Sequence, residues 1–215
     1  MISNYDMDVL KIDLTVISTI VLISHVLNST LNNKEVLFNN QWINVSLATI
    51  LGYALHALLF HKVSSMISNN LKLENEVAIT VLFDIVKFGS IFVSKEIILA
   101  YMTNRPINFN TQWQMESGFT ILGYITFDAL KVKVHIMQNY DIIFNDIIKL
   151  SLGQLSANYF MNNTVTYENF MNMLVNAVGI AAYHLIIKNF VTDNKSIYTG
   201  ALTSLPPDYL LKKKN

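Results

Sequence analysis

A stretch of thirteen residues occurs twice in this chain, and the repetition restricts the possible folds more than any other feature. QWINVSLATILGY begins at Gln41 and QWQMESGFTILGY begins at Gln112, and eight of the thirteen positions are identical without a gap. At the same offset of 71 residues, positions 13–66 and 84–137 share 17 identities over 54 positions. Some of the identities, such as Asn33 with Asn104, are polar, so a shared apolar bias does not explain them. The chain therefore contains an internal duplication.

A third, shorter and more diverged copy follows the first two. The tetrapeptide DIVK at Asp84 returns as DIIK at Asp146, and Gly179 stands where Gly52 and Gly123 stand in the earlier copies. Repetition at a fixed period predicts one supersecondary unit that is used several times. We predict three units, 13–66, 84–137 and 146–190, within a single membrane domain that covers residues 1–215, with residues 191–215 as a cytoplasmic tail.

Low charge content points to a membrane environment. Charged residues make up 14% of the chain and apolar residues 52%, and the mean hydropathy is +0.37, whereas soluble proteins have roughly 25% charged residues. A helix needs about 20 mostly apolar residues to cross a bilayer. Six segments approach this requirement, and the polar fifth is the weakest: 13–31, 44–63, 78–101, 116–134, 142–161 and 170–190.

The distribution of basic residues tests this topology separately from hydropathy. Six spans place both termini on one side of the membrane, and cytoplasmic loops carry an excess of Lys and Arg. The side of the termini receives ten basic residues, the other side receives Lys34 and Arg105, and three lie within spans. We therefore expect an integral membrane protein with both termini in the cytoplasm. The ten are Lys11, Lys62, Lys72, Lys131, Lys133, Lys188, Lys195, Lys212, Lys213 and Lys214.

These observations predict an all-α polytopic membrane protein in which three tandem two-helix hairpins form a six-helix bundle with pseudo-threefold symmetry. Repeats with an even number of spans are parallel and are related by an axis along the membrane normal. The arrangement of three tandem two-helix units is similar to that of mitochondrial carriers. This chain is shorter and lacks their proline-centred acidic and basic signature, so no carrier residue is transferred to it.

Symmetry would turn scattered polar residues into layers around the axis. His25, Glu96 and Asn158 each lie twelve residues beyond the aspartates of their units, and a rise of 1.5 Å per residue places them about 18 Å further along the helix. Ionisable groups inside a membrane usually face a bundle interior or a water-filled cavity. The alternative is an interhelical hydrogen-bond cluster that only fixes packing. The candidate axis residues are His25, Lys95, Glu96, Asn158, His56, Asp128 and His184, with Asp128 and His184 as a possible pair.

A second charged layer is expected at the cytoplasmic ends of the helices. Acidic residues near helix N-termini and basic residues near C-termini both suit the helix dipole. The alternative interpretation is a salt-bridge gate on the inner side. The members of this layer are Asp13, Asp84, Asp146, Lys62, Lys133, Lys188, Lys87 and Lys149.

Two further residue types recur at matching positions. Gly52, Gly123 and Gly179 lie mid-helix, where small residues allow helices to approach closely, and we expect them to serve helix packing. Trp42 and Trp113 lie at the outer ends of their helices, and we expect them to be membrane-interface anchors.

The sequence favours a non-enzymatic function. It has no Cys, net charge zero and no nucleotide, zincin or serine-hydrolase motif, so we expect no metal, no cofactor and no nucleic-acid partner. The main hypothesis is that the protein binds or passes a small solute or ion along a central polar axis. The alternative is a structural membrane protein, of a viral or organelle membrane, that acts as an anchor or scaffold. Its partners would be the lipid bilayer, a second copy of the chain, or other membrane or capsid proteins.

Overall fold

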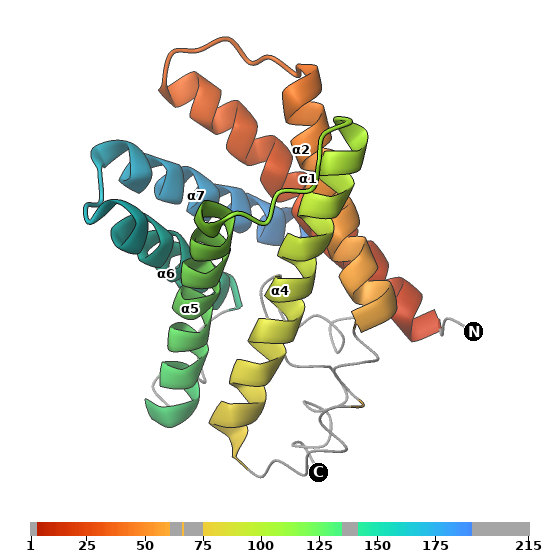
Figure 1. Cartoon of the computed structure of the whole chain (residues 1–215), viewed down its shortest axis with the longest axis vertical. Helices are drawn as coiled ribbons and strands as arrows, with labels where there is room; N and C mark the ends of the chain where they lie inside the picture. The colour runs from red at the N-terminus through yellow and green to blue at the C-terminus, as the bar shows by residue number, and fades with distance from the viewer. Residues whose placement is uncertain (1–3, 61–65, 67–74, 135–141, 191–215) are drawn as a thin grey trace.

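The computed structural model describes residues 4–60, 66, 75–134 and 142–190, and at some helix ends it describes the backbone alone. The all-helical prediction is confirmed: this part of the chain is helical and contains no strand. Figure 1 shows three successive hairpins, each made of two helices joined by a short loop. The elements are α1 (Asn4–Leu31), α2 (Asn40–Leu55) with its π-helical continuation η1 (His56–Phe60), α4 (Glu76–Met102), α5 (Thr111–Val134), α6 (Ile142–Asn162) and α7 (Tyr167–Phe190).

The helices that leave the hairpin loops begin earlier than the apolar segments predict. Asparagine side chains start two of them: Asn39 accepts a hydrogen bond from the Trp42 N–H, and Asn110 accepts one from the Trp113 N–H. An oxygen at the N-cap satisfies one of the free N–H groups of the first turn. The first turn of each helix is thus polar and capped, and hydropathy marks only the apolar part that follows.

Each hairpin loop also begins with the same backbone conformation. Asn33, Asn104 and Asn163 follow α1, α4 and α6, and their φ angles are 51°, 50° and 54°. Asparagine adopts this left-handed conformation more readily than other non-glycine residues, which makes it a common helix terminator. The first two of these residues are 71 positions apart, so the repeated sequence carries the same turn in both hairpins.

The helices pack as a closed ring. Neighbours in the chain contact one another in the order α1, α2, α4, α5, α6 and α7, and α7 returns to contact α1. Among the described residues, no helix contacts one on the opposite side of the ring through its backbone, and η1 contacts only α1, α2 and α4. This arrangement leaves the centre of the ring to side chains.

The recurrent glycines lie where one hairpin meets the next. A Cβ at Gly52 would lie 3.0 Å from the Ile91 carbonyl of α4, and one at Gly179 would lie 3.0 Å from Ser24 Oγ of α1. A Cβ at Gly123 would overlap the Leu152 carbonyl of α6. The three glycines therefore occupy the α2–α4, α5–α6 and α7–α1 contacts, where the absence of a side chain permits close approach.

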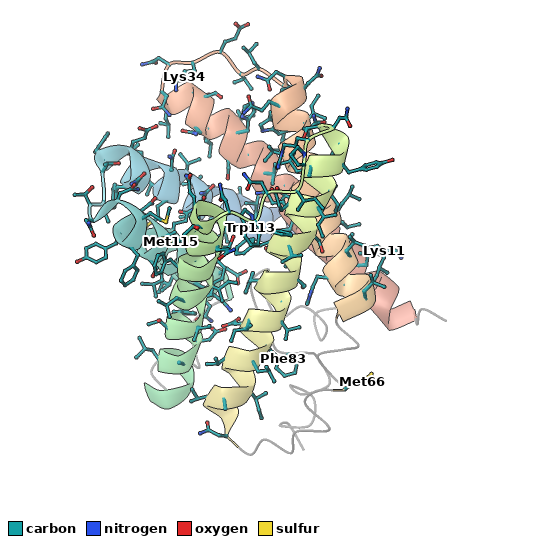
Figure 2. The ribbon with its side chains drawn as sticks, viewed as in Figure 1. Lys11, Lys34, Met66, Phe83, Trp113 and Met115 are labelled. Atoms are coloured by element: carbon teal, nitrogen blue, oxygen red, sulfur yellow. The ribbon has the colours of Figure 1, made fainter. Side chains whose placement is uncertain are left out.

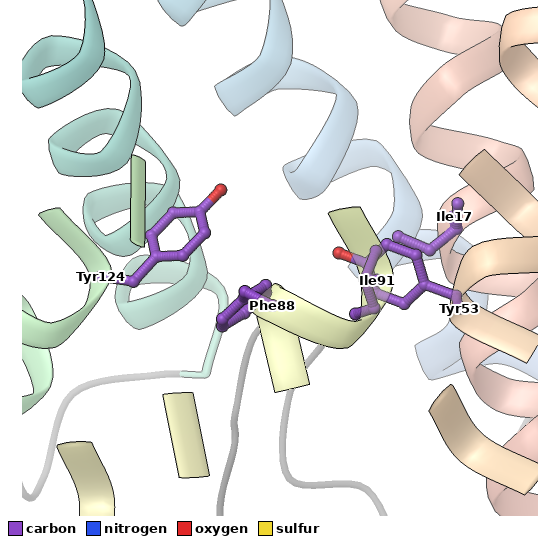
Figure 3. Packing of buried hydrophobic residues seen from close by; sticks show 5 residues of the cluster. All are labelled: Ile17, Tyr53, Phe88, Ile91 and Tyr124. Atoms are coloured by element: carbon purple, nitrogen blue, oxygen red, sulfur yellow. The ribbon is translucent and has the colours of Figure 1, made fainter. Parts of the chain in front are cut away.

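The centre of the ring is filled by a small apolar cluster. Ile17, Tyr53, Phe88, Ile91 and Tyr124 are all at least nine-tenths buried. Helix α4 supplies two of them: Phe88 lies toward Tyr124, and Ile91 lies toward Tyr53 and Ile17 (Figure 3). The ring centroids of Phe88 and Tyr124 are 4.4 Å apart. Helix α4 therefore joins the side of the ring that holds α1 and α2 to the side that holds α5.

Apolar side chains cover the outward faces of the helices, whereas charged side chains such as Asp84 and Lys149 are buried. Leu51, Ile85, Val93 and Leu122 are examples of large apolar residues that are exposed. Side chains project outward from all the helices in Figure 2, with Lys34 beyond the loop end of α1 and Lys11 toward its opposite end. Segments Asn40–Leu59 and Val77–Met102 are long and apolar enough to cross a membrane by length and composition, a test that core helices of soluble proteins also pass.

Candidate functional site

The two most buried charged side chains in the described structure, Asp84 and Lys149, belong to a network that joins three helices. The Lys149 ammonium of α6 donates to Asp84 Oδ1 of α4 at 2.6 Å and to Asp128 Oδ2 of α5 at 2.5 Å. The exposed fractions of these side chains are 3% for Lys149, 0% for Asp84 and 14% for Asp128. We call these three residues the inner network. A buried ion pair needs such geometry because desolvation of each charge costs several kcal/mol.

Two further charged residues are buried on the same helices as this network. Lys87 follows Asp84 by three residues on α4, and Asp146 precedes Lys149 by three on α6, and both are at least nine-tenths buried. Residues three apart share a helix face, so DIVK and DIIK each direct an acid and a base to one side. The ammonium groups of Lys87 and Lys149 lie 5.7 Å and 5.1 Å from the centroid of the Phe88 ring.

The helix-dipole interpretation is wrong for Asp84. Helix α4 begins at Glu76, so Asp84 lies two turns inside the helix, and the dipole effect falls off within the first turn. Its carboxylate binds Lys149 instead. The side chains of Asp13, Lys62, Lys133 and Lys188 lie outside the described part of the structure, so the rest of the predicted inner layer stays a prediction.

A second ion pair lies toward the loop end of α4. Glu96 binds Arg105 through both carboxylate oxygens, at 2.7 Å and 2.8 Å, and also accepts the Asn108 N–H at 2.9 Å. The Glu96 carboxylate raises the pKa of Arg105 by accepting its hydrogen bonds, so the guanidinium stays charged. We call Glu96 and Arg105 the outer pair. It fastens the 103–110 loop to the helix that precedes it.

His25 makes the corresponding contact in the first hairpin. Its Nε2 lies 3.1 Å from the Leu37 carbonyl, and Leu37 is 71 positions before Asn108. The His25 ring also packs against Trp42, with centroids 4.8 Å apart. Two of the three residues predicted to share this polar layer, His25 and Glu96, therefore hold the loop of their own hairpin. Glu96 therefore finds its partners in the loop that follows its own helix.

Beside these loop contacts lie a hollow of about 320 Å³ at the outer pair and the 103–110 loop and two further pockets. The first, which we call the charged pocket, has a volume of about 230 Å³ and is lined by Phe92, Lys95, Glu96, Trp113, Glu116, Ser117 and Thr120 of α4 and α5. The second, the neutral pocket, has a volume of about 380 Å³ and is lined by Val21, Ser24, His25, Asn28, Trp42, Gln154, Asn172, Val175 and Asn176.

Helix α4 shows how the pockets relate to the inner network. Asp84 and Lys87 come first along the helix, then the core residues Phe88 and Ile91, and then Lys95 and Glu96 of the charged pocket. At 1.5 Å per residue, Asp84 and Lys95 are about 16 Å apart along the helix axis. The apolar cluster therefore separates a charged inner layer from a polar outer layer.

The remaining predicted axis residues are not gathered at one point. His56 is buried on η1 and its Nδ1 lies 2.8 Å from Ser90 Oγ, which donates to the Lys87 carbonyl. Asn158 is half-buried on α6. The proposed partner of Asp128, His184, has a side chain outside the described part of the structure, and the partner that Asp128 has is Lys149.

Sequence reasoning missed several residues of the site. It placed Lys149 and Asp84 in one layer and Asp128 in another, and it assigned no role to Glu116, Asn108, Asn110 or Gln154. The three-residue spacing of DIVK and DIIK was the available signal for a shared charged face. No group of three or more His, Asp or Glu residues able to hold a metal ion occurs in the described ranges.

The two tryptophans pack within their own hairpins. Trp42 packs on Phe38 as well as on His25, and Trp113 packs on Phe109, with ring centroids 4.8–4.9 Å apart. Trp113 also lines the charged pocket, and Trp42 lines the neutral pocket.

Comparison with known proteins adds no relative: no family model, curated protein or solved structure matches this chain.

Proposed function

We propose that this protein is an integral membrane protein that takes up a small polar solute in pockets on the outer side of a six-helix ring and passes it inward when the inner network opens. The observation that carries the proposal is the inner network itself. Lys149, Asp84 and Asp128 come from two different hairpins and meet inside the ring. Charged groups within a membrane are costly, and they commonly mark solute or ion pathways.

The distribution of polarity supports the membrane part of the proposal. Large apolar side chains face outward on every helix, while charged side chains such as Asp84 and Lys149 are buried. Water would favour the opposite arrangement, because buried charges and exposed apolar surface both cost free energy. In the proposal all six helices span the bilayer, with the loops at 32–39 and 103–110 on the outer side and both termini in the cytoplasm.

The layers along α4 support the gating part. Along α4 the apolar cluster residues Phe88 and Ile91 lie between the residues of the charged pocket and Asp84 of the inner network. An ion pair between hairpins can exist in two discrete states, bonded or separated, and such an element can respond to a ligand. Opening would break the Lys149 contacts and let the hairpins move apart on the inner side.

One observation favours a second function, that of a structural membrane protein. His25 and Glu96 bond the loops of their own hairpins, and apolar residues fill the middle of the ring. In this alternative the polar contacts only stabilise the bundle, and the outward apolar faces anchor it among lipids or against other membrane or capsid proteins.

Sided labelling of single cysteines separates the two functions. The chain has no native cysteine, so Ser24→Cys in the neutral pocket and Ser117→Cys in the charged pocket provide unique reporters. In oriented proteoliposomes, a membrane-impermeant maleimide is expected to label both from the loop side only. Asn40→Cys at the start of α2 is the positive control, and Leu51→Cys on the outward face of α2 is the lipid-facing control.

The same reporters are then combined with Asp84→Asn, Asp128→Asn and Lys149→Met, which remove all three charges of the inner network. We expect labelling of Ser24→Cys and Ser117→Cys from the opposite side to appear in this background. If the cysteines are still labelled from the loop side only, while Asn40→Cys still reacts, the inner network is not a gate and the structural function is favoured.

A further inference from the structure

The charged and neutral pockets use matching positions of the two repeated hairpins. Four lining residues of the charged pocket lie 71 positions after four lining residues of the neutral pocket. The first two units thus contribute equivalent positions to two hollows beside their tryptophans, and the residues around them differ in charge. The neutral pocket is also lined by residues of α6 and α7. The four pairs are Val21 with Phe92, Ser24 with Lys95, His25 with Glu96, and Trp42 with Trp113.

Lys95 is the unusual member of the charged pocket. It lies on α4 within the apolar segment Val77–Met102, and its backbone packs on Gly52 of α2. Among the described residues its ammonium makes no hydrogen bond and no ion pair, whereas the neighbouring Glu96 uses both oxygens. The carboxylates of Glu116 and Glu96 lie near enough to interact with its charge, but neither contacts it directly. A partly buried ammonium group without a direct hydrogen bond is a site for an anionic group.

The acids around the pocket restrict which anion fits. Glu116 lines the pocket on α5 and, among the described side chains, has no ion-pair partner. Its carboxylate would repel a multiply charged anion, because like charges at close range disfavour one another. The same carboxylate would attract an ammonium group. One pocket therefore contains an ammonium group, that of Lys95, and a carboxylate, that of Glu116, and neither is directly bonded.

The remaining lining residues set the size and polarity. A volume of about 230 Å³ is below the roughly 300–1,000 Å³ of pockets for drug-sized ligands. Phe92 and Trp113 provide an apolar wall, and Ser117 adds a hydroxyl group. From these features we infer that the charged pocket binds a small zwitterion of the α-amino-acid type, its carboxylate on Lys95 and its ammonium group toward Glu116. The inference rests on the proposed function and names the substrate class of that site.

The chain provides a matched pair of reporters for a test. It has two tryptophans, one in each pocket. The full chain with Trp42→Phe reports on the charged pocket through Trp113, and Trp113→Phe reports on the neutral pocket through Trp42. Each purified variant is titrated with L-alanine, acetate, methylammonium and inorganic phosphate, and tryptophan fluorescence is followed.

We expect L-alanine to give a saturable change in the Trp113 reporter and none in the Trp42 reporter. Acetate and methylammonium should need at least about tenfold higher concentrations, because each makes only one of the two charged contacts. Lys95→Gln and Glu116→Gln should each raise the L-alanine midpoint at least about tenfold. Glu116 is exposed, so its variant keeps the test valid if Lys95→Gln does not fold.

Several results would overturn the inference. If acetate binds at the same concentration as L-alanine, Glu116 has no role in ligand binding. If phosphate binds more tightly than L-alanine, the pocket is a simple anion site. An equal response of both reporters would show that the charged pocket is not selective. The labelling test of the proposed function can fail separately. If L-alanine binds but the side from which the cysteines are labelled does not change, the protein has an outer binding site and no passage. If that side changes but L-alanine does not bind, the protein passes another solute.

Discussion

The inner network and the outer pair are built from the same kinds of charged group but connect different parts of the molecule. The inner network joins α4, α5 and α6, and its lysine and Asp84 are almost fully buried. The outer pair joins Glu96 to an arginine nine residues later, and that arginine is 35% exposed. One set of charges holds two hairpins together inside the ring, and the other closes a single loop at its edge. The difference in burial predicts a difference in energetic consequence.

The largest effect is expected when the lysine of the inner network is removed. Lys149→Met leaves Asp84 and Asp128 buried without their counter-charge, which typically costs about 3–5 kcal/mol. For a chain of this length such a loss lowers the melting temperature by on the order of 10 °C, measured by thermal unfolding in detergent. Lys34→Met, at an exposed loop residue, is the control. A loss no greater than that of the control would mean that the network does not hold the helices.

A smaller effect is expected when the whole inner network is neutralised. The triple variant Asp84→Asn, Asp128→Asn and Lys149→Met removes all three charges of the network together, and neutral replacement of a buried ionic group is often close to neutral for stability. We expect it to be at least about 2 kcal/mol more stable than Lys149→Met alone. A triple variant as unstable as the single one would show that the ionic contacts themselves stabilise the ring.

The two aspartates of the inner network should differ from each other. Asp84→Asn removes a carboxylate with 0% exposure and should cost about 2 kcal/mol, whereas Asp128→Asn, at a side chain with 14% exposure, should cost about 1 kcal/mol. In both variants Lys149 keeps one anionic partner. Chemical denaturation of the two variants under identical conditions measures the ranking, and a reversed order would assign the dominant contact to Asp128.

The smallest effect is expected at the outer pair. Glu96→Gln retains an oxygen for the Asn108 N–H but loses the ionic contact with Arg105, so we expect a cost of about 1 kcal/mol. Proteolysis within the 103–110 loop should report this change before global unfolding does, because only the loop loses its attachment. Gln112→Ala, at an exposed residue beside the loop, should leave the cleavage rate unchanged. A melting temperature as low as that of Lys149→Met would contradict the comparison.

Much of the fold followed from the repeated sequence. The all-helical class and the six helical segments could be predicted because the apolar segments and the offset of 71 residues are visible without coordinates. The helix starts could not, because Asn39 and Asn110 act through caps in polar segments that hydropathy does not score. Six membrane spans and pseudo-threefold symmetry remain predictions.

The site was harder to predict than the fold. The sequence places His25 and Glu96 in equivalent positions, but it does not show that each loop folds back to bring Leu37 or Asn108 within bonding distance. Likewise, Lys149 meets Asp84 only because helices from different hairpins become neighbours in the ring. Contacts of this kind depend on tertiary arrangement, so residue spacing predicted which side chains would be important but not their partners.

The contact between α7 and α1 has a consequence for biosynthesis. A ring that is closed by its first and last helices cannot be completed until the final helix has left the ribosome. Until then α1 lacks the neighbour that places Gly179 against Ser24, and its polar face has only α2 beside it. The first helix to be synthesised is therefore among the last to acquire all its contacts, and a chain truncated before α7 should be the form that quality-control proteases recognise.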